Sequence, residues 1–267
     1  MPILQLILIA AIQGVTEFLP ISSSGHLILL PGLTGMQDQG QVIDVAVHMG
    51  TLGAVVVYFW RDVKQALGGL PLLLCGRVDT PGARLALGLS IATIPVVLAG
   101  TVLHFTHLDE AMRSITVIGW TMLIFGLVLF WADQTGASLK GAADWRPRDA
   151  LILGLWQVVA LIPGTSRSGI TITGARQMGY SRSEAARLSM LMSIPTIFAS
   201  GALLGTEVAI EADSAVIRDG GLAALFAFAS ALLALSLMMR LLRSVSFTPY
   251  VAYRVILGVG LLVIAYS

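Results

Sequence analysis

The chain has 267 residues, of which 56% are hydrophobic and 12% are charged, and its mean hydropathy is +0.87. Soluble domains carry roughly 25% charged residues, so these values exclude an ordinary soluble protein and predict a membrane protein. The formal net charge of +1 supplies no basic surface of the kind that nucleic acid requires, and we expect no nucleic-acid partner.

The first predicted element, about residues 3 to 36, is apolar but interrupted. It has no Lys or Arg before its apolar run and no small-residue cleavage site before Glu17, so we expect mature protein rather than a signal peptide. The sequence LPISSSGH, from Leu19 to His26, breaks the run. Irregular backbone within a membrane needs protein or a water-filled cavity to bond its amides, so this region predicts a re-entrant helix, loop and helix.

Six apolar windows, each long enough to cross a bilayer, predict transmembrane helices at about 42–60, 85–104, 114–132, 187–205, 222–239 and 250–266. A second interrupted region, about 151–180, contains IPGTSRSG and predicts a second re-entrant hairpin. The single cysteine, Cys75, excludes an internal disulfide and a thiolate metal cluster. The predicted fold class is therefore an all-α polytopic membrane protein with six transmembrane helices plus two re-entrant helical hairpins.

The cations predict how the chain is oriented. The loops after the first, third and fifth spans share one side and carry most of the cations: Arg61, Lys64, Arg77, Arg84, Lys140, Arg146, Arg148, Arg240 and Arg243. Because cytoplasmic loops are rich in Lys and Arg, we expect these loops in the cytoplasm and both termini outside. The sequence SRSE, from Ser181 to Glu184, predicts a capping box that opens the fourth span.

The two interrupted regions resemble each other. Aligning Pro20 with Pro163 matches Ser23 with Ser166 at an offset of 143, and Gln13 and Gln157 lie just upstream of each motif. Three spans follow each motif, so the two hairpins enter from opposite faces and meet near the midplane, as in an inverted repeat. We predict one integral membrane domain, 1–267, with repeat 1 at about 1–132, a cytoplasmic linker at about 133–150 and repeat 2 at about 151–267.

Arg167 is the most informative polar residue of the second motif. An arginine at membrane depth costs at least about 2.5–3.5 kcal/mol on insertion scales, so it normally has a partner or a water-filled pocket. Its neighbours are hydroxyls and glycines: Gly164, Thr165, Ser166, Ser168 and Gly169. This set suits an anion with many oxygens, and a helix that begins near Gly169 would add its amino-terminal amides. The alternative is a structural arginine that caps a helix or pairs with Glu17.

The first motif supplies candidates for chemistry. Gln13 and Glu17 are four residues apart and share one face of a helix. Glu17 has three open roles: it accepts a proton, binds a divalent cation, or pairs with Arg167. One Glu and one Gln make an incomplete oxygen shell, so a metal there would be shared with substrate phosphates. Ser23 and His26 are candidate nucleophile, acid or base. A lone histidine in an apolar chain more often has a packing role, but the Glu, Ser and Gly residues within the same ten positions favour a chemical role for His26.

The other histidines give weaker signals. For Asp44 and His48, at the start of the first span, we favour a local hydrogen bond over a place in the cavity. Solvation is sufficient to explain His104 and His107. Taken together, the polar residues predict a pocket inside the bilayer for a phosphate ester or anhydride on a lipid, with phosphoryl transfer as its chemistry.

Two motifs, QGVTEFLPISSSGH and PGTSRSG, resemble the signatures of the BacA-type undecaprenyl-diphosphate phosphatases. The stretches HMGTLGAVVVYFWRD and SFTPYVAYR extend the resemblance over nearly the whole chain. It implies a multi-pass enzyme of the bacterial inner membrane, with its active site open to the periplasm. The implied reaction hydrolyses undecaprenyl diphosphate to undecaprenyl phosphate, which recycles the carrier for peptidoglycan synthesis and gives bacitracin resistance.

The resemblance also implies roles for single residues. The pattern (E/Q)xxxE falls on Gln13 and Glu17, SS(S/T)GH on Ser22 to His26, and PGxSRSG on Pro163 to Gly169. It implies catalysis by Glu17, Ser23 and His26, with either Ser23 or His26 as nucleophile. A divalent cation, Mg²⁺ or Ca²⁺, would be shared by the diphosphate, Glu17 and Gln13, and the uncharged Gln13 excludes a pair of carboxylates there. The expected phosphate-binding residues are Gly164, Thr165, Ser166, Arg167 and Ser168.

We expect three partners: a polyprenyl diphosphate lipid, the bilayer, and a second copy of the chain in a homodimer. Two other functional classes stay open. The inverted repeat is also typical of a secondary transporter, here of a small anion, and the same fold suits a polyprenyl-phosphate flippase. A transporter tolerates replacement of His26, and a flippase moves the headgroup without releasing phosphate.

Overall fold

The computed structural model describes residues 1–35, 39–108, 112–211 and 214–267, and these segments are helical except for turns and one isolated bridge between Lys140 and Tyr180. The longer helices are α1 (Ile3–Phe18), α2 (Ser23–Thr34), α3 (Gln41–Tyr58), α4 (Trp60–Leu74), α5 (Pro81–Thr106), α7 (Ile115–Thr135), α8 (Pro147–Val158), α9 (Arg167–Gln177), α10 (Arg182–Glu211), α11 (Ser214–Leu241) and α12 (Thr248–Tyr266). Short 3-10 helices occupy Ala142–Asp144 and Val159–Leu161.

Among the described residues, six helices are long and apolar enough to cross a membrane: α3, α5, α7, α10, α11 and α12. Each overlaps one of the six predicted windows, so the predicted all-α polytopic class is confirmed. Large apolar side chains on their outer faces, including Leu225, Leu233 and Ile256, are exposed in the isolated chain and suit contact with lipid. At the start of α10 the amide of Glu184 donates to the hydroxyl of Ser181, as the SRSE pattern predicts.

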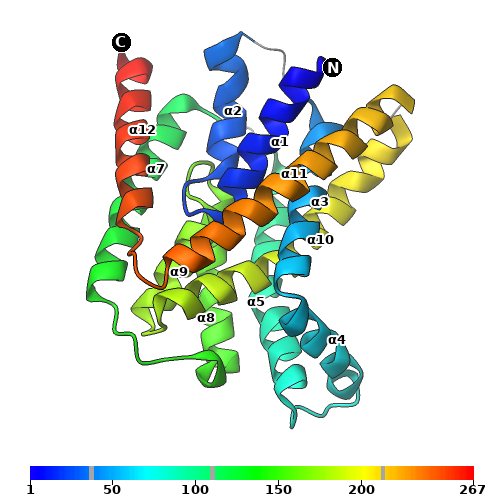
Figure 1. Cartoon of the computed structure of the whole chain (residues 1–267), viewed down its shortest axis with the longest axis vertical. Helices are drawn as coiled ribbons and strands as arrows, with labels where there is room; N and C mark the ends of the chain where they lie inside the picture. The colour runs from blue at the N-terminus through cyan, green and yellow to red at the C-terminus, as the bar shows by residue number, and fades with distance from the viewer. Residues whose placement is uncertain (36–38, 109–111, 212–213) are drawn as a thin grey trace.

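Both interrupted regions form helix, loop and helix, as predicted. Figure 1 shows that α1 descends from the end that holds both termini and that α2 returns toward the same end. The three spans α3, α5 and α7 separate this hairpin from the α8 and α9 hairpin. In a membrane the second hairpin therefore starts on the opposite side, which is the arrangement that an inverted repeat requires.

One helix was not predicted. Residues 61–84 were expected to be a cytoplasmic loop, but α4 occupies most of that segment and packs along α5, at the end opposite the termini (Figure 1). Its 15 residues are too few to span a bilayer, and charged residues such as Arg61 and Lys64 interrupt its apolar face. A search for long apolar windows therefore misses it.

The linker between α7 and α8 is fixed by a buried polar network. Arg176, at 2% exposure, donates to the backbone carbonyls of Asp133, Gly136 and Tyr180. The hydroxyl of Tyr180 donates to Asp149 at 2.7 Å, and burial raises the pKa of this phenol. These contacts hold the end of the second hairpin against the linker.

The two hairpin loops share one backbone feature. Ser22 and Ser166 have φ of 73° and 72°, a left-handed conformation that few side chains adopt. Each caps the helix that follows, because its hydroxyl accepts from the amide three residues on, that of Gly25 or Gly169. The structural match is therefore Ser22 with Ser166, an offset of 144, and the alignment of Ser23 with Ser166 is wrong by one residue. The second loop has one more residue after its proline.

Candidate active site

Glu17 is the centre of the polar cluster between the two hairpins. Its side chain is 7% exposed and lies at the last turn of α1, which ends because Pro20 follows. One carboxylate oxygen accepts from Ser23 Oγ at 2.6 Å and from Gln13 Nε2 at 3.0 Å. The other accepts from Arg167 Nη2 at 2.7 Å. The structure thus brings four predicted site residues together around one buried carboxylate.

Ser23 and Arg167 occupy the same position in the two repeats. Each is the first residue of its helix, α2 or α9, and each donates to Glu17. The amino termini of both helices therefore face the same carboxylate, where backbone amides and the helix dipole favour negative charge. The Nη1 of Arg167 has no hydrogen-bond partner among the described residues, so the guanidinium has a donor left for a further anion.

The remaining predicted phosphate-binding residues are deeply buried. Ser168 Oγ donates to Leu19 O at 2.9 Å and so joins the second loop to the first. Ser166 caps α9, and the hydroxyl of Thr165 is buried without a partner in the described structure. Gly164 has φ 85°, and an added Cβ would lie 2.2 Å from Thr121 Oγ1. This glycine lets the loop pack against α7, and its carbonyl accepts from Arg254.

His26 lies apart from this cluster. Its Nδ1 is 2.6 Å from Ser22 O, and its Nε2 is 2.6 Å from the hydroxyl of Tyr253 on α12. The two rings stack with centroids 5.6 Å apart. Both ring nitrogens therefore have partners, and neither partner is Glu17 or Ser23. This arrangement favours the packing interpretation of His26.

A polar chamber of about 640 Å³ adjoins the cluster. Ser24, Pro163 and His48 line it next to the two loops, and His104, His107 and Arg113 line it farther out. His104 and His107 both lie on the chamber wall, and His107 is exposed, which is compatible with the expected solvation of these side chains. Glu17, Ser23 and Arg167 are not part of this wall, and His48 joins the chamber to Glu17. The chamber offers space for a hydrated headgroup near the cluster, with the cationic Arg113 in its wall.

His48 was underrated in the sequence. Its Nδ1 is 2.7 Å from the backbone carbonyl of Asp44, so the favoured local contact exists, although with the main chain rather than the carboxylate. Its Nε2 lies 3.9 Å from Glu17, and its side chain is 36% exposed to the chamber. The spacing of Asp44 and His48 was a signal for one helix face, but only the packing of α3 against α1 brings that face to Glu17.

The residues fit a divalent cation only as a shared ligand set. No group of three or more His, Cys, Asp or Glu side chains within the described ranges could hold a metal alone. Gln13 Oε1 is buried without a partner in the same ranges, and it is an oxygen of the type that Mg²⁺ and Ca²⁺ prefer. Gln13 and Glu17 would hold such a cation together with oxygens of a phosphate ligand.

Comparison with known proteins identifies the family of the chain. A family model described as bacitracin resistance protein BacA matches residues 6–260. The chain belongs to the BacA family. It is 74% identical over 267 residues to a protein of Ruegeria pomeroyi named undecaprenyl-diphosphatase, and 66% identical over 267 residues to one of the same name from Jannaschia sp., with 100% of each chain covered in both cases. Undecaprenyl-diphosphatase 1 of Rhodospirillum rubrum is 47% identical over 274 aligned positions, which cover 100% of this chain and 96% of that protein.

Membership of the BacA family confirms the resemblance drawn from the two motifs. Arg254 lies in SFTPYVAYR, one of the stretches that carry the family resemblance, but its sequence context predicted no role for it. It is fully buried and donates to four backbone carbonyls, those of Pro20, Thr121, Met122 and Gly164. Pro20 and Gly164 belong to the two different hairpin loops. An arginine within a membrane span indicates that its side chain has hydrogen-bond partners, but the sequence did not show that the partners of Arg254 are carbonyls of the two hairpin loops.

Proposed function

We propose that this protein hydrolyses undecaprenyl diphosphate to undecaprenyl phosphate and inorganic phosphate, as the names of its relatives describe for those proteins. The observation that carries the proposal is the contact of Glu17 with both Ser23 and Arg167. A buried carboxylate beside a hydroxyl is the arrangement that activates a nucleophile, and a guanidinium beside it suits phosphate oxygens. A protein that only carries phosphate needs the guanidinium, but it does not need a carboxylate beside a hydroxyl.

Glu17 acts as the general base and Ser23 as the nucleophile. The hydroxyl proton of Ser23 moves to Glu17 while Ser23 Oγ bonds to the terminal phosphorus. The bond from that phosphorus to the bridging oxygen breaks, and undecaprenyl phosphate leaves with the electron pair. Water then attacks the phosphoserine and passes one proton to bulk water as its oxygen bonds to phosphorus. Glu17 returns its proton to Ser23 Oγ as the bond from Oγ to phosphorus breaks, which releases phosphate and restores both side chains. The 2.6 Å contact places Glu17 within proton-transfer distance of the hydroxyl at the outset.

The cationic groups stabilise the charge that develops on the phosphoryl oxygens. Arg167 has a spare Nη1 donor, and α2 and α9 both begin at residues that donate to Glu17, so the positive ends of two helix dipoles lie near this carboxylate. When substrate binds, Arg167 exchanges part of its contact with Glu17 for the phosphate. A divalent cation shared by Gln13, Glu17 and the diphosphate would neutralise further charge.

We place the protein in the bacterial inner membrane, with the chamber open to the periplasm and both termini on that side. The cation-rich loops support this orientation, since they follow the first, third and fifth spans. The substrate is then reached from the outer leaflet. A homodimer stays a prediction from the sequence.

Phosphate release from undecaprenyl diphosphate by purified protein in detergent tests the reaction. We expect release by the wild type with Mg²⁺ or Ca²⁺, and a loss of roughly 100-fold or more for Glu17→Gln and Arg167→Ala, as for other transition-state contacts. Arg243→Ala, at an exposed position, is the matched control for loss of an arginine. If folded wild type releases no phosphate with either cation, the reaction is wrong, and headgroup movement in liposomes decides between a flippase and an anion transporter.

A further inference from the structure

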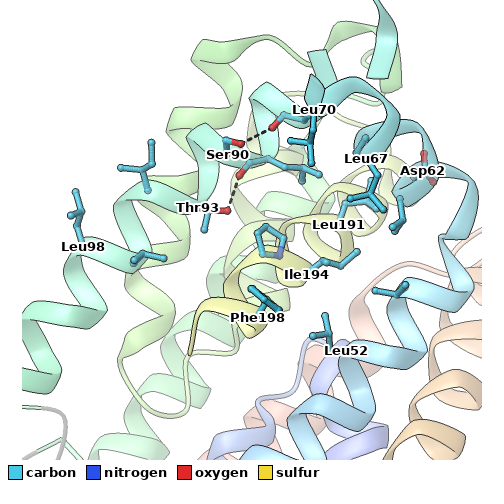
Figure 2. A pocket seen from close by; sticks show the side chains of 18 residues that line it. Leu52, Asp62, Leu67, Leu70, Ser90, Thr93, Leu98, Leu191, Ile194 and Phe198 are labelled. Carbon is cyan, nitrogen blue, oxygen red and sulfur yellow. Dashed lines mark hydrogen bonds between the residues drawn. The ribbon is translucent and has the colours of Figure 1, made fainter. Parts of the chain in front are cut away.

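A large apolar groove opens on the side of the molecule, away from the polar chamber. Figure 2 shows this inner groove, which has a volume of about 760 Å³ and lies among α3, α4, α5 and α10. Its walls include Leu52, Leu67, Leu70, Leu191, Ile194 and Phe198. Apolar side chains from four helices thus converge on a space large enough for a branched hydrocarbon chain.

The few polar atoms in the inner groove are already bonded. Ser90 Oγ donates to the carbonyl of Ala86, and Thr93 Oγ1 donates to that of Leu89, as the dashed lines in Figure 2 show. At the cytoplasmic end Asp62 pairs with Arg187. Because these groups make their hydrogen bonds within the protein, the groove offers a ligand mainly apolar contact.

A second cavity adjoins both the inner groove and the polar chamber. This outer groove, about 690 Å³, lies between α5 and α10. It shares Val97 with the inner groove, and it shares His104, Leu161, Ser200 and Leu204 with the chamber. From His104 to Ala86 the path follows α5 for about 27 Å at 1.5 Å per residue, close to the roughly 30 Å of a bilayer's hydrocarbon core.

We propose that the isoprenoid tail of the lipid substrate lies in this seam between α5 and α10, with its headgroup in the chamber and its distal units in the inner groove. This inference rests on the proposed function, because the occupant is the tail of that substrate. The lining residues that the three cavities share carry it. A tail leaving the chamber meets the outer groove at four shared residues, and Leu161 and Leu204 among them offer apolar contact.

A competing groove provides the control. It has a volume of about 740 Å³, lies between α5 and α8, and is lined by Val102 and Leu155, among others. Only Leu161 is common to its wall and that of the chamber. Val97 and Val102 are both lipid-facing valines of α5, at 37% and 60% exposure, and they report on the two grooves separately.

Photocrosslinking tests where the tail lies without requiring turnover. A photoreactive benzoylphenylalanine replaces Val97, Phe198 or Val102, and the probe is undecaprenyl diphosphate radiolabelled in its tail, so the label survives hydrolysis. We expect capture at Val97 and Phe198 to exceed capture at Val102 by roughly fivefold, equivalent to about 1 kcal/mol of preference. Unlabelled undecaprenyl diphosphate should compete, and phosphatidylglycerol should not. Equal capture at the three positions, stronger capture at Val102, or equal competition by phospholipid would each overturn the proposal.

Kinetics with two tail lengths gives a second measurement. Val97→Trp narrows the junction of the grooves, and Val102→Trp adds the same bulk on the other face of α5. We expect Val97→Trp to raise KM for undecaprenyl diphosphate roughly fivefold and to change KM for farnesyl diphosphate by no more than about twofold, since a short tail ends before the inner groove. Equal changes of KM for the two diphosphates, or a larger change of KM in Val102→Trp, would contradict the location of the tail between α5 and α10. If the wild type releases no phosphate, the proposed function fails, and the capture pattern alone still decides where the tail binds.

Discussion

Glu17 links the two catalytic requirements through one side chain. It accepts from the hydroxyl of Ser23 and from the guanidinium of Arg167, and these donors begin the matching helices of the two repeats. One hairpin therefore supplies a hydroxyl and the other a cation at the same structural position. The two hairpins are alike in their backbone caps, but they differ in the side chains that they bring to Glu17.

Ser23 and His26 can be separated by substitution. We expect Ser23→Ala to lower kcat by roughly 100-fold or more, because the attacking oxygen is lost. We expect His26→Gln to lower kcat by less than about tenfold, because general acid or base groups contribute more than that and the ring contacts Ser22 O and Tyr253 instead of Glu17. Single-turnover phosphate release measures both.

The control for this comparison is Tyr253→Phe, which removes the phenol that contacts His26 Nε2 and keeps the ring stack. It should behave like His26→Gln. A collapse of kcat in His26→Gln with full activity in Ser23→Ala would make His26 the nucleophile and refute the assignment.

The sequence was sufficient to predict site residues whose polar side chains are unusual in an apolar chain. It was not sufficient to predict contacts that depend on how the helices pack. Glu17, Ser23 and Arg167 stand out because polar groups are expensive inside an apolar chain, and the structure brings them together. His48 reaches Glu17 only through the packing of α3 against α1, a contact that no spacing in the sequence encodes. His26 follows Ser23 by three residues in α2, but its ring nitrogens contact Ser22 O and Tyr253 rather than Glu17, and this pairing with α12 is not encoded by any spacing in the sequence.

The loop before α9 depends on a glycine that can be tested directly. Gly164 combines a φ of 85° with an added Cβ only 2.2 Å from Thr121 Oγ1. Gly179 has a similar φ of 89°, but its nearest neighbour would be 3.9 Å away. Gly179→Ala should therefore lower the free energy of unfolding by about 1–2 kcal/mol, because alanine is strained in the left-handed conformation. Gly164→Ala should lower it by about 1–3 kcal/mol more, because the added Cβ also clashes with Thr121.

Thermal unfolding of the two variants in detergent measures this difference, and phosphate release shows its effect on the site. Gly164→Ala should also lower activity, since the displaced loop carries Arg167. Equal unfolding temperatures for the two variants would show that the contact with Thr121 does not restrict the loop.

At the level of helices, long apolar windows were sufficient to predict all six spans. Breaks at Pro20 and Pro163 were sufficient to predict both hairpins. The one-residue error in matching the loops arose because prolines were aligned, whereas the equivalent residues are the left-handed caps Ser22 and Ser166. Helix α4 was missed because its amphipathic 15 residues are stabilised by packing on α5, which lies outside its own sequence.

Arg254 joins the two halves of the molecule. It donates to carbonyls of both hairpin loops and of α7. Because no carboxylate of the described segments pairs with this buried guanidinium, every one of these bonds is important. We expect Arg254→Met to destabilise the protein by about 3 kcal/mol or more, because four carbonyls lose their donor in a buried region. Arg243→Met, at an exposed position, should change stability by less than about 0.5 kcal/mol.

Thermal unfolding with and without inorganic phosphate measures both arginine variants. Arg254→Met should lose the stabilisation by phosphate as well, since the loops that bind it are no longer held together. An unfolding temperature equal to that of Arg243→Met would show that the loops are joined by other contacts.

The orientation of the whole molecule can be tested with a residue it already contains. Cys75 is the single cysteine of the chain and is exposed just after α4, at the end opposite both termini (Figure 1). If the cation-rich loops are cytoplasmic, a membrane-impermeant maleimide should label Cys75 in inverted vesicles and leave it unlabelled in intact cells. A Cys75→Ser variant with Ser267→Cys moves the thiol to the carboxyl terminus and should reverse the pattern. Labelling of Cys75 in intact cells would invert the topology, and the chamber would then open toward the cytoplasm, where it could not meet a diphosphate in the outer leaflet.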